Sequence, residues 1–329
     1  MTSPAQAHFD ISPANMAAHA VIAHKRIVRQ IYKTPLLPSK TIGAAMGCDL
    51  FFKADNFQLT GSFKMRGASS KMSAMTGNEK LITASSGNHG IACARAAQTF
   101  NRDLTVVLPE TVAQAKLAKI KSYGVTVILK GAESGLAEQH AQKLAAETDE
   151  LIYVSPYNDA DVVAGQGSIG LELLDQHDSI DNIFISMGGG GLISGIGSVI
   201  KSFSPQTRII GVAAKNSAAL AASMMAGEVV ETEHHPTLAD GVAGGMDVDS
   251  VTLPLAIKTV DEVITCSEAD ITASLRRLAH EEHQLVEGSA ALALAGLEQA
   301  ASSFKGATNV VLLCGSNYDK ATLAPLLAN

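Results

Sequence analysis

The chain has 329 residues, of which 47% are hydrophobic and 17% charged, a composition typical of a globular protein with one large or two medium domains. Its formal net charge is −7, only 4% of its residues are aromatic and tryptophan is absent, which argues against a nucleic-acid-binding protein. No uninterrupted apolar run reaches the roughly 18 residues that a membrane span needs, and the N-terminal segment lacks the pattern of a signal peptide. The four cysteines lie far apart without a CxxC pair, which indicates reduced thiols and a cytoplasmic protein.

Short apolar runs alternate along the chain with longer helical patterns. Ser12-Pro13 opens the series as a favourable helix start, a capping residue followed by proline. Nine apolar runs then predict strands buried on both faces. They cover residues 49–55, 80–85, 104–109, 126–131, 151–156, 182–188, 208–214, 262–267 and 309–315. Residues 112–123 and 134–147 have the amphipathic pattern of crossover helices. The sequence therefore predicts an α/β fold with mainly parallel sheets flanked by helices, and so many strands favour two sheets.

Three glycine-rich turns follow predicted strands, where open α/β sheets bind their ligands. They are TASSGNHG (83–90), MGGGGLISG (187–195) and CGSN (314–317). In the second turn, Gly188, Gly189, Gly190 and Gly191 present main-chain N–H groups at the start of a helix near Leu192, which predicts a phosphate site. Tight packing of strand against helix is the alternative role for these glycines.

Two other phosphate-binding motifs are excluded. A dinucleotide fingerprint counted from Gly189 would need a third glycine where Ser194 stands. A Walker loop needs a Gly-Lys pair, and the sequence contains none.

Lys64 lies between Phe63 and Met65 in the segment GSFKMRGA. An apolar pocket disfavours the ammonium form of lysine, so this setting suits an amine that acts as a nucleophile or base. Such a lysine beside a phosphate cradle suggests a phosphorylated carbonyl cofactor held as an imine, for which pyridoxal 5'-phosphate is the obvious candidate. HEEH at 280–283 lacks the spacing of a zinc motif, and no metal site is expected.

These motifs together resemble those of the serine/threonine dehydratase and serine racemase family, the fold-type II pyridoxal-phosphate-dependent enzymes. The resemblance rests on GSFKMRGA, SSGNHG, GGGGLISG and CGSN in family order, and VAGQGSIGLELL, PTLADG and LVEGSAALALA add to it. It covers nearly the whole chain and implies a two-domain fold like that of the tryptophan synthase β subunit. Residues 1–50 and 158–329 would form the larger, cofactor-binding domain, and residues 51–157 a smaller mobile domain with Lys64 near the boundary.

The resemblance also implies roles for single residues. Lys64 is similar to the Schiff-base lysine and Phe63 would pack near the cofactor ring, while Gly188 to Gly191 and Leu192 would hold the phosphate. Asn88 would bind the phenolic oxygen of the cofactor. Cys314 would face its pyridine nitrogen. The substrate carboxylate would be received by the loop residues Ser85, Ser86, Asn88 and His89.

The activity implied is β-elimination from a small β-hydroxy amino acid such as L-threonine or L-serine, giving a 2-oxo acid and ammonia. Lys64 would act as the base. A racemase remains an alternative, because Ser86 resembles the racemase serine on the far face of the cofactor and would then be catalytic. Against it, Ala84 replaces a racemase histidine, and Lys215 and Ala221 replace racemase metal ligands.

Other activities and partners also remain to be weighed. PTLADGVAGGMDVDSVTLPLA resembles hydroxyectoine-degrading dehydratases, so a larger β-hydroxy amino acid derived from hydroxyectoine is a further alternative. A dehydratase for 3-hydroxyaspartate is another. A non-catalytic ligand-binding protein and a nicotinamide oxidoreductase are alternatives from other classes. The expected partners are a small amino-acid substrate and a second copy of the chain in a homodimer, without nucleic acid or membrane.

Overall fold

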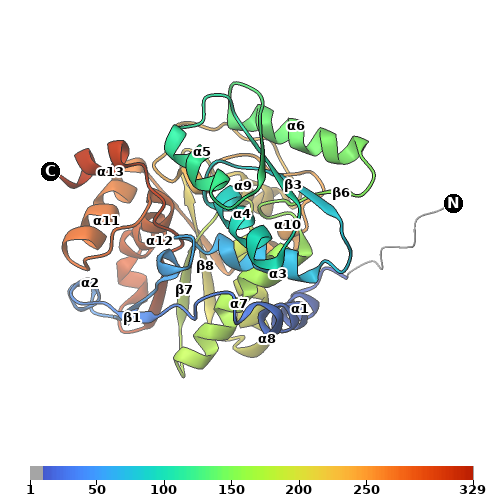
Figure 1. The fold of residues 1–329 in the computed structure, drawn as a ribbon. Helices are drawn as coiled ribbons and strands as arrows, with labels where there is room; N and C mark the ends of the chain where they lie inside the picture. Colours follow the sequence, from blue (N-terminus) through green and yellow to red (C-terminus); the bar gives the residue numbers. More distant parts are fainter. Residues whose placement is uncertain (1–9, 329) are drawn as a thin grey trace.

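The computed structural model describes residues 10–328, which form two sheets with helices on their faces (Figure 1). The first nine residues, on which the expectation about a signal peptide partly rests, lie outside this range. Each of the nine predicted strands is present, and both predicted crossover helices are confirmed. None of the helices within residues 10–328 is long and apolar enough to cross a membrane.

The larger sheet has six strands in the order β1-β2-β10-β7-β8-β9. All neighbours are parallel except the edge strand β1, which runs antiparallel to β2. The strands are β1 (Leu36–Pro38), β2 (Asp49–Lys53), β7 (Asn182–Ser186), β8 (Arg208–Ala214), β9 (Glu262–Cys266) and β10 (Thr308–Leu312). β1 was not among the predicted strands, since three residues that end in proline at a sheet edge carry little alternating pattern.

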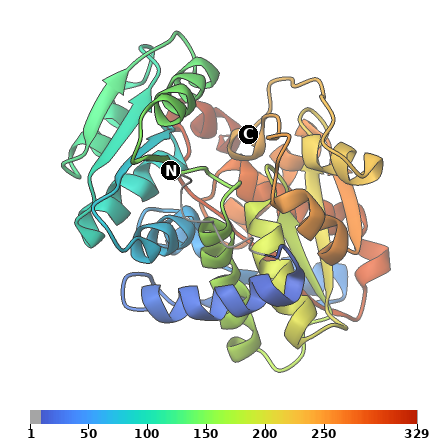
Figure 2. The same cartoon turned by 90° about the vertical axis from the view of Figure 1, so that its right-hand side faces the viewer.

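Helices cover both faces of the larger sheet. In Figure 1, α12 (Gly288–Gln299) lies to the left of β7 and β8, whereas α7 (Ala160–Gln176) and α8 (Gly191–Phe203) lie to their right. The long helix α1 (Pro13–Ile27) packs across α7 and α8, and it starts after Ser12 as predicted (Figure 2). The remaining elements of this unit are α2 (Ile42–Met46), α9 (Ala219–Ala226), η2 (Asp240–Val242), α10 (Thr252–Thr259), α11 (Glu268–His280), η3 (Ala301–Phe304) and α13 (Lys320–Leu327), and η1 (Asp55–Phe57) lies between β2 and α3 in the chain.

The smaller sheet has four parallel strands in the order β5-β4-β3-β6. Its elements are α3 (Lys64–Ala74), β3 (Lys80–Ala84), α4 (Asn88–Phe100), β4 (Leu104–Leu108), α5 (Gln114–Lys121), β5 (Thr126–Leu129), α6 (Ser134–Glu147) and β6 (Leu151–Tyr153). Successive strand residues point to opposite faces, so Leu81 packs in the core with α4 while Ile82 packs against α6.

The predicted domain boundary at residue 51 cuts through β2, which pairs with β1 and β10 in the larger sheet. Residues 51–53 therefore belong with the larger sheet. The sequence could not assign them because the neighbours of β2 come from distant parts of the chain. The division of the chain into a larger domain and a mobile smaller one otherwise stays a prediction.

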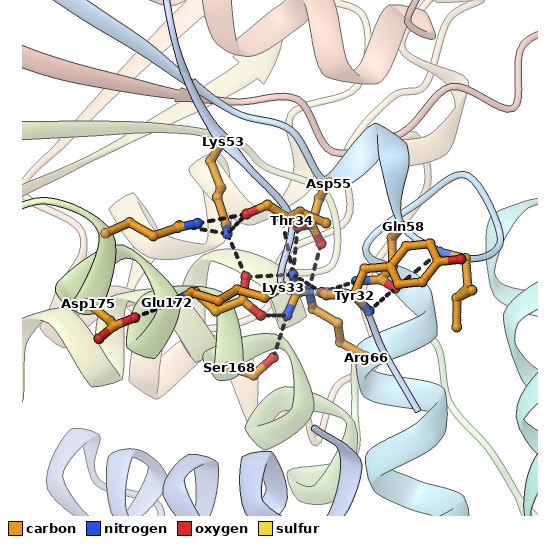
Figure 3. A network of polar contacts seen from close by, with 12 residues as sticks. Tyr32, Lys33, Thr34, Lys53, Asp55, Gln58, Arg66, Ser168, Glu172 and Asp175 are labelled. Atoms are coloured by element: carbon orange, nitrogen blue, oxygen red, sulfur yellow. Dashed lines mark hydrogen bonds and ion pairs between the residues drawn. The ribbon is translucent and has the colours of Figure 1, made fainter. Parts of the chain in front are cut away.

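A buried network of charges fixes α3 against α7 (Figure 3). The guanidinium of Arg66 donates to Asp55 at 2.7 Å and to Glu172 at 2.6 Å. Lys53 donates to the same glutamate at 2.5 Å and to the carbonyl oxygen of Thr34 at 2.8 Å. All four charged side chains are buried, and their pairing removes most of the cost of burying them. The network therefore holds the helix that begins with Lys64.

Candidate active site

Lys64 is the first residue of α3, and its amine points to the carbonyl oxygen of Pro156, with a distance of 2.8 Å between Nζ and O. The amine also lies 5.1 Å from the centre of the Phe63 ring. Burial lowers the pKa of Lys64 to about 8, although nearby acidic groups act in the opposite direction. A larger fraction of this amine is therefore neutral at physiological pH than of an ordinary lysine.

Main-chain pairing brings the segment before Lys64 to the end of β10. The N–H of Phe63 donates to the carbonyl oxygen of Cys314 at 3.0 Å, and Ser62 forms a β-bridge with Gly315. Cys314 is buried, and burial raises the pKa of its thiol well above the ordinary value. The thiol is therefore a neutral group in the same cavity as the lysine.

Asn88, at the start of α4, is held by two partners from the larger unit. Its amide nitrogen donates to Glu287 Oε1 at 2.8 Å, and its amide oxygen accepts from the side chain of Asn317 at 2.7 Å. Glu287 also accepts the main-chain N–H of Asn317 at 2.9 Å. An amide nitrogen carries two hydrogens, so the second N–H of Asn88 remains for a ligand in the cavity.

The glycine run lies between β7 and the N-terminus of α8. Gly190 has a φ of +88°, a left-handed conformation that favours glycine, and Gly191 begins the helix. A side chain at Gly189 would place its Cβ 2.5 Å from the ring of Tyr157. The close approach of Tyr157 is thus one reason for glycine at position 189. A second reason for the glycine run is that it leaves the main-chain N–H groups at the start of α8 accessible to a ligand.

A cavity of about 410 Å³ joins these elements, and all the residues predicted to bind the cofactor line it. Those that line it are Phe63, Lys64, Asn88, Gly188, Gly189, Gly190, Gly191, Leu192 and Cys314. Ser85, Ser86 and His89 do not belong to this lining. The side chain of Ser85 instead accepts the N–H of Gly87 at 3.2 Å in the turn before α4.

The ring of His89 points into the smaller unit. Its Nε2 lies 3.0 Å from the carbonyl oxygen of Val154 and 3.5 Å from Cys93 Sγ, and burial lowers its pKa to about 3. One residue along a helix turns the side chain by about 100°, so His89 faces the core when Asn88 faces the cavity. The side chain of His89 therefore does not point into the cavity where the substrate is predicted to bind.

The lining also contains residues that were not predicted as site residues, and Glu138, Tyr157, Asp247 and Glu287 are among them. Glu287 is buried, and burial raises its pKa to about 7. The position of Glu287 in LVEGSAALALA, one of the segments that carry the family resemblance, was the one feature of the sequence that could have indicated a site residue. The sequence around Glu138 is typical of the polar face of an amphipathic helix, and nothing in it indicates that Glu138 lines a cavity.

The residues present fit pyridoxal phosphate. The α8 N-terminus offers main-chain N–H groups to a phosphate, as helix starts commonly do. Lys64 offers a buried amine for the carbonyl carbon, and Asn88 offers a free N–H. Cys314 offers a neutral thiol rather than a carboxylate.

Comparison with known proteins agrees with this chemistry. The family model described as "pyridoxal-phosphate dependent enzyme" matches residues 27–315. The L-threonine ammonia-lyase of Thermotoga maritima is 33% identical over 300 residues, covering 90% of this chain and 74% of that protein. The processed form of threonine deaminase isoform 2 from Solanum lycopersicum superposes with a TM-score of 0.89 at 30% identity, covering 95% of this chain and 92% of that one. Maize serine racemase superposes with a TM-score of 0.86 at 30% identity, covering 95% and 96% of the two chains.

Proposed function

Because this chain belongs to the family of pyridoxal-phosphate-dependent enzymes, we propose that it converts a small β-hydroxy amino acid such as L-threonine or L-serine to a 2-oxo acid and ammonia. The observation that carries the proposal is the buried amine of Lys64, with a pKa of about 8, set beside a glycine loop, an amide and a neutral thiol. Relatives described as threonine ammonia-lyase and threonine deaminase support the same reaction.

When bound, pyridoxal phosphate supplies an electrophilic carbonyl and draws electrons away from the α-carbon of an attached amino acid. Lys64 would hold the cofactor and, as a free base, would accept the α-proton at Nζ. Its lowered pKa favours the form that can accept a proton. The carbonyl oxygen of Pro156, 2.8 Å from Nζ, orients the amine.

The other residues bind and orient. We propose that Gly188 to Gly191 and Leu192 hold the phosphate, that Asn88 donates to the phenolic oxygen, and that Phe63 packs near the ring. The substrate carboxylate lies at the N-terminus of α4, where main-chain N–H groups lack helical partners. The α4 helix begins at Asn88, next to the serines of SSGNHG.

A racemase is the second candidate, favoured by the similarity to maize serine racemase. Racemisation needs a proton donor on the far face of the cofactor, and Ser86 is the residue we propose for it. Elimination ranks first, because Ala84, Lys215 and Ala221 replace residues that the racemase pattern would carry.

An amino-acid screen tests the proposed function. Purified protein loaded with pyridoxal phosphate is incubated with L-threonine and L-serine, release of 2-oxo acid and ammonia is measured, and the remaining serine is analysed for chirality. Equal amounts of 2-oxo acid and ammonia support elimination. D-serine without 2-oxo acid would replace the proposal by the racemase, and protein that does not bind the cofactor would contradict both.

We further propose that residues 54–157 move as the smaller domain, that the enzyme is a homodimer, and that it acts in the cytoplasm. Support for the motion is that the cavity takes Asn88 and Glu138 from one unit and Gly188 and Cys314 from the other. Hydrogen exchange of α6 with and without cofactor tests the motion, and light scattering tests for the mass of two chains.

A further inference from the structure

The cavity around Lys64 is acidic. Among the described residues that line it, the charged side chains are one lysine, Lys64, and three carboxylates, Glu138, Asp247 and Glu287. Arginine and histidine do not occur in this lining. Glu287 is already engaged with Asn88 and Asn317, which leaves Glu138 and Asp247 as carboxylates for a ligand.

One short segment contacts the Glu138 carboxylate, the main chain of Asp247 and the lysine amine. Tyr153 donates from its hydroxyl to Glu138 Oε1 at 2.8 Å. Three residues later, the carbonyl oxygen of Pro156 accepts from the amine of Lys64. The hydroxyl of the next residue, Tyr157, accepts the main-chain N–H of Asp247 at 2.7 Å. Residues 153–157 therefore form hydrogen bonds with Glu138, with Asp247 and with the amine of Lys64.

The two acids come from different units and line the same cavity. Glu138 belongs to α6, and Asp247 follows η2 in the larger unit. Burial raises the pKa of Glu138, and the charge of Asp247 raises it further. A cation placed between two such carboxylates relieves their repulsion, whereas a second anion adds to it.

One face of α6 forms the wall beside Glu138. Gly135, Glu138, Gln139 and Gln142 follow the helical spacing i, i+3, i+4, i+7, and all four line the cavity. A Cβ at Gly135 would meet nothing within 4 Å, so there is space on this wall. The wall is polar and roomy, unlike a closed apolar pocket shaped for the methyl group of threonine.

Resting on the proposed function, we infer that the preferred substrate is a β-hydroxy amino acid whose side chain carries an ammonium group beyond the β-carbon, bound between Glu138 and Asp247. Tyr153 occupies Oε1 of Glu138, and Oε2 remains to accept an N–H of the ligand. A substrate with a second carboxylate, such as 3-hydroxyaspartate, meets two acids and no arginine, and is discriminated against by repulsion. Glu138 and Asp247 are thus specificity-determining residues.

Two matched pairs of compounds test the inference on the cofactor-loaded enzyme. We compare kcat/KM for 3-hydroxylysine and 3-hydroxynorleucine, which have the same chain length and differ in the terminal ammonium. Calorimetry then compares binding of L-lysine and L-norleucine, which lack the β-hydroxyl and cannot undergo the elimination. We expect the ammonium compound to be favoured in both pairs by at least about tenfold, and 3-hydroxyaspartate to react at least about tenfold less efficiently than L-threonine.

The variant Glu138→Gln should reduce both preferences about tenfold while keeping the hydrogen-bonding shape of the side chain. Glu147→Gln, which removes the same charge from the exposed end of α6, is the matched control and should leave both ratios unchanged. Any of three results would overturn the inference. The parent protein could show no preference for the ammonium compound in kcat/KM or in binding, Glu138→Gln could show the same preference as the parent, or 3-hydroxyaspartate could turn over faster than L-threonine. Turnover of L-threonine without charge preference contradicts only this inference, whereas no turnover of any compound contradicts the proposed function itself.

Discussion

Lys64 and Arg66 lie two residues apart on α3 and have opposite electrostatic surroundings. Arg66 is fully buried among paired charges (Figure 3), and although burial acts to lower its pKa, Asp55 and Glu172 raise it. Lys64 has a carbonyl oxygen as its hydrogen-bond partner, and burial lowers its pKa to about 8. The comparison shows that partners, rather than burial alone, decide whether a buried cation stabilises the fold or serves as a reactive amine.

The largest expected effect is on turnover. Lys64→Ala should reduce kcat for 2-oxo acid release by at least about 10³-fold, because one amine both holds the cofactor and accepts the proton. Lys121→Ala, at the exposed end of α5, should behave like the parent protein. Retention of more than a few per cent of the parent activity in Lys64→Ala would show that another group carries the chemistry.

Arg66→Met should instead damage the fold. It leaves Asp55 and Glu172 buried without their shared partner, and removing one member of a buried ion pair costs about 3–5 kcal/mol. Urea unfolding of the cofactor-free protein measures this loss, with the exposed Arg29→Met as the control. An unchanged unfolding midpoint in Arg66→Met would mean that the network adds little to stability.

Lys64→Met should have the opposite sign from Arg66→Met. The folded-state pKa of Lys64 is lowered from 10.5 to about 8, so charging this amine at pH 7 costs the folded state free energy. One pKa unit corresponds to about 1.4 kcal/mol, and removal of the amine should raise the free energy of unfolding at pH 7 by as much as about 3 kcal/mol. In the parent protein, the destabilisation caused by the charged amine is complete below the folded-state pKa of about 8 and disappears as pH rises to the unfolded-state pKa of 10.5. The gain in stability of Lys64→Met over the parent should therefore shrink from pH 8 towards pH 10.

Denaturation curves of the cofactor-free Lys64→Met variant at pH 7 and pH 9.5 provide the measurement. A gain that does not change with pH would assign the effect to packing of the methionine and not to the ammonium charge.

Cys314→Ser should cause a small change in activity, within about fivefold, because serine also offers a neutral hydrogen-bonding group. Cys314→Asp should alter the absorption spectrum of the bound cofactor and shift products away from elimination. If the aspartate variant keeps the parent spectrum and product ratio while the serine variant is inactive, Cys314 does not face the pyridine nitrogen.

The smallest effect is expected for Ser86, which lies in the turn before α4 and outside the cavity lining. Ser86→Ala should remove formation of D-serine and leave pyruvate formation from L-serine within about twofold of the parent. Chiral chromatography and a 2-oxo acid assay report the two products. Unchanged D-serine formation in the variant would exclude Ser86 as the far-face acid.

Local patterns predicted nine of the ten strands within the described residues, the helix start at Pro13 and the helix that begins close to Leu192. These features depend on alternation, capping residues and glycine turns, which are encoded by neighbouring residues. The wall of the cavity could not be predicted in this way. Asn88 and Glu287, which share a hydrogen bond, are 199 residues apart, and Glu138 has the pattern of an exposed helical residue. The side-chain direction of His89 could not be predicted either. Asn88 faces the cavity and His89 the core because they are consecutive residues of α4, and the sequence alone does not show which side of that helix faces the cavity.

The central claim is that Lys64 is the residue that bonds the cofactor, and mapping the modified lysine tests it most directly. The purified protein is loaded with pyridoxal phosphate, reduced with borohydride, digested and analysed by mass spectrometry. We predict that the phosphopyridoxyl group is found on Lys64 and that the yellow colour disappears on reduction. Modification of another lysine in place of Lys64, or protein that takes up no cofactor, would contradict the account.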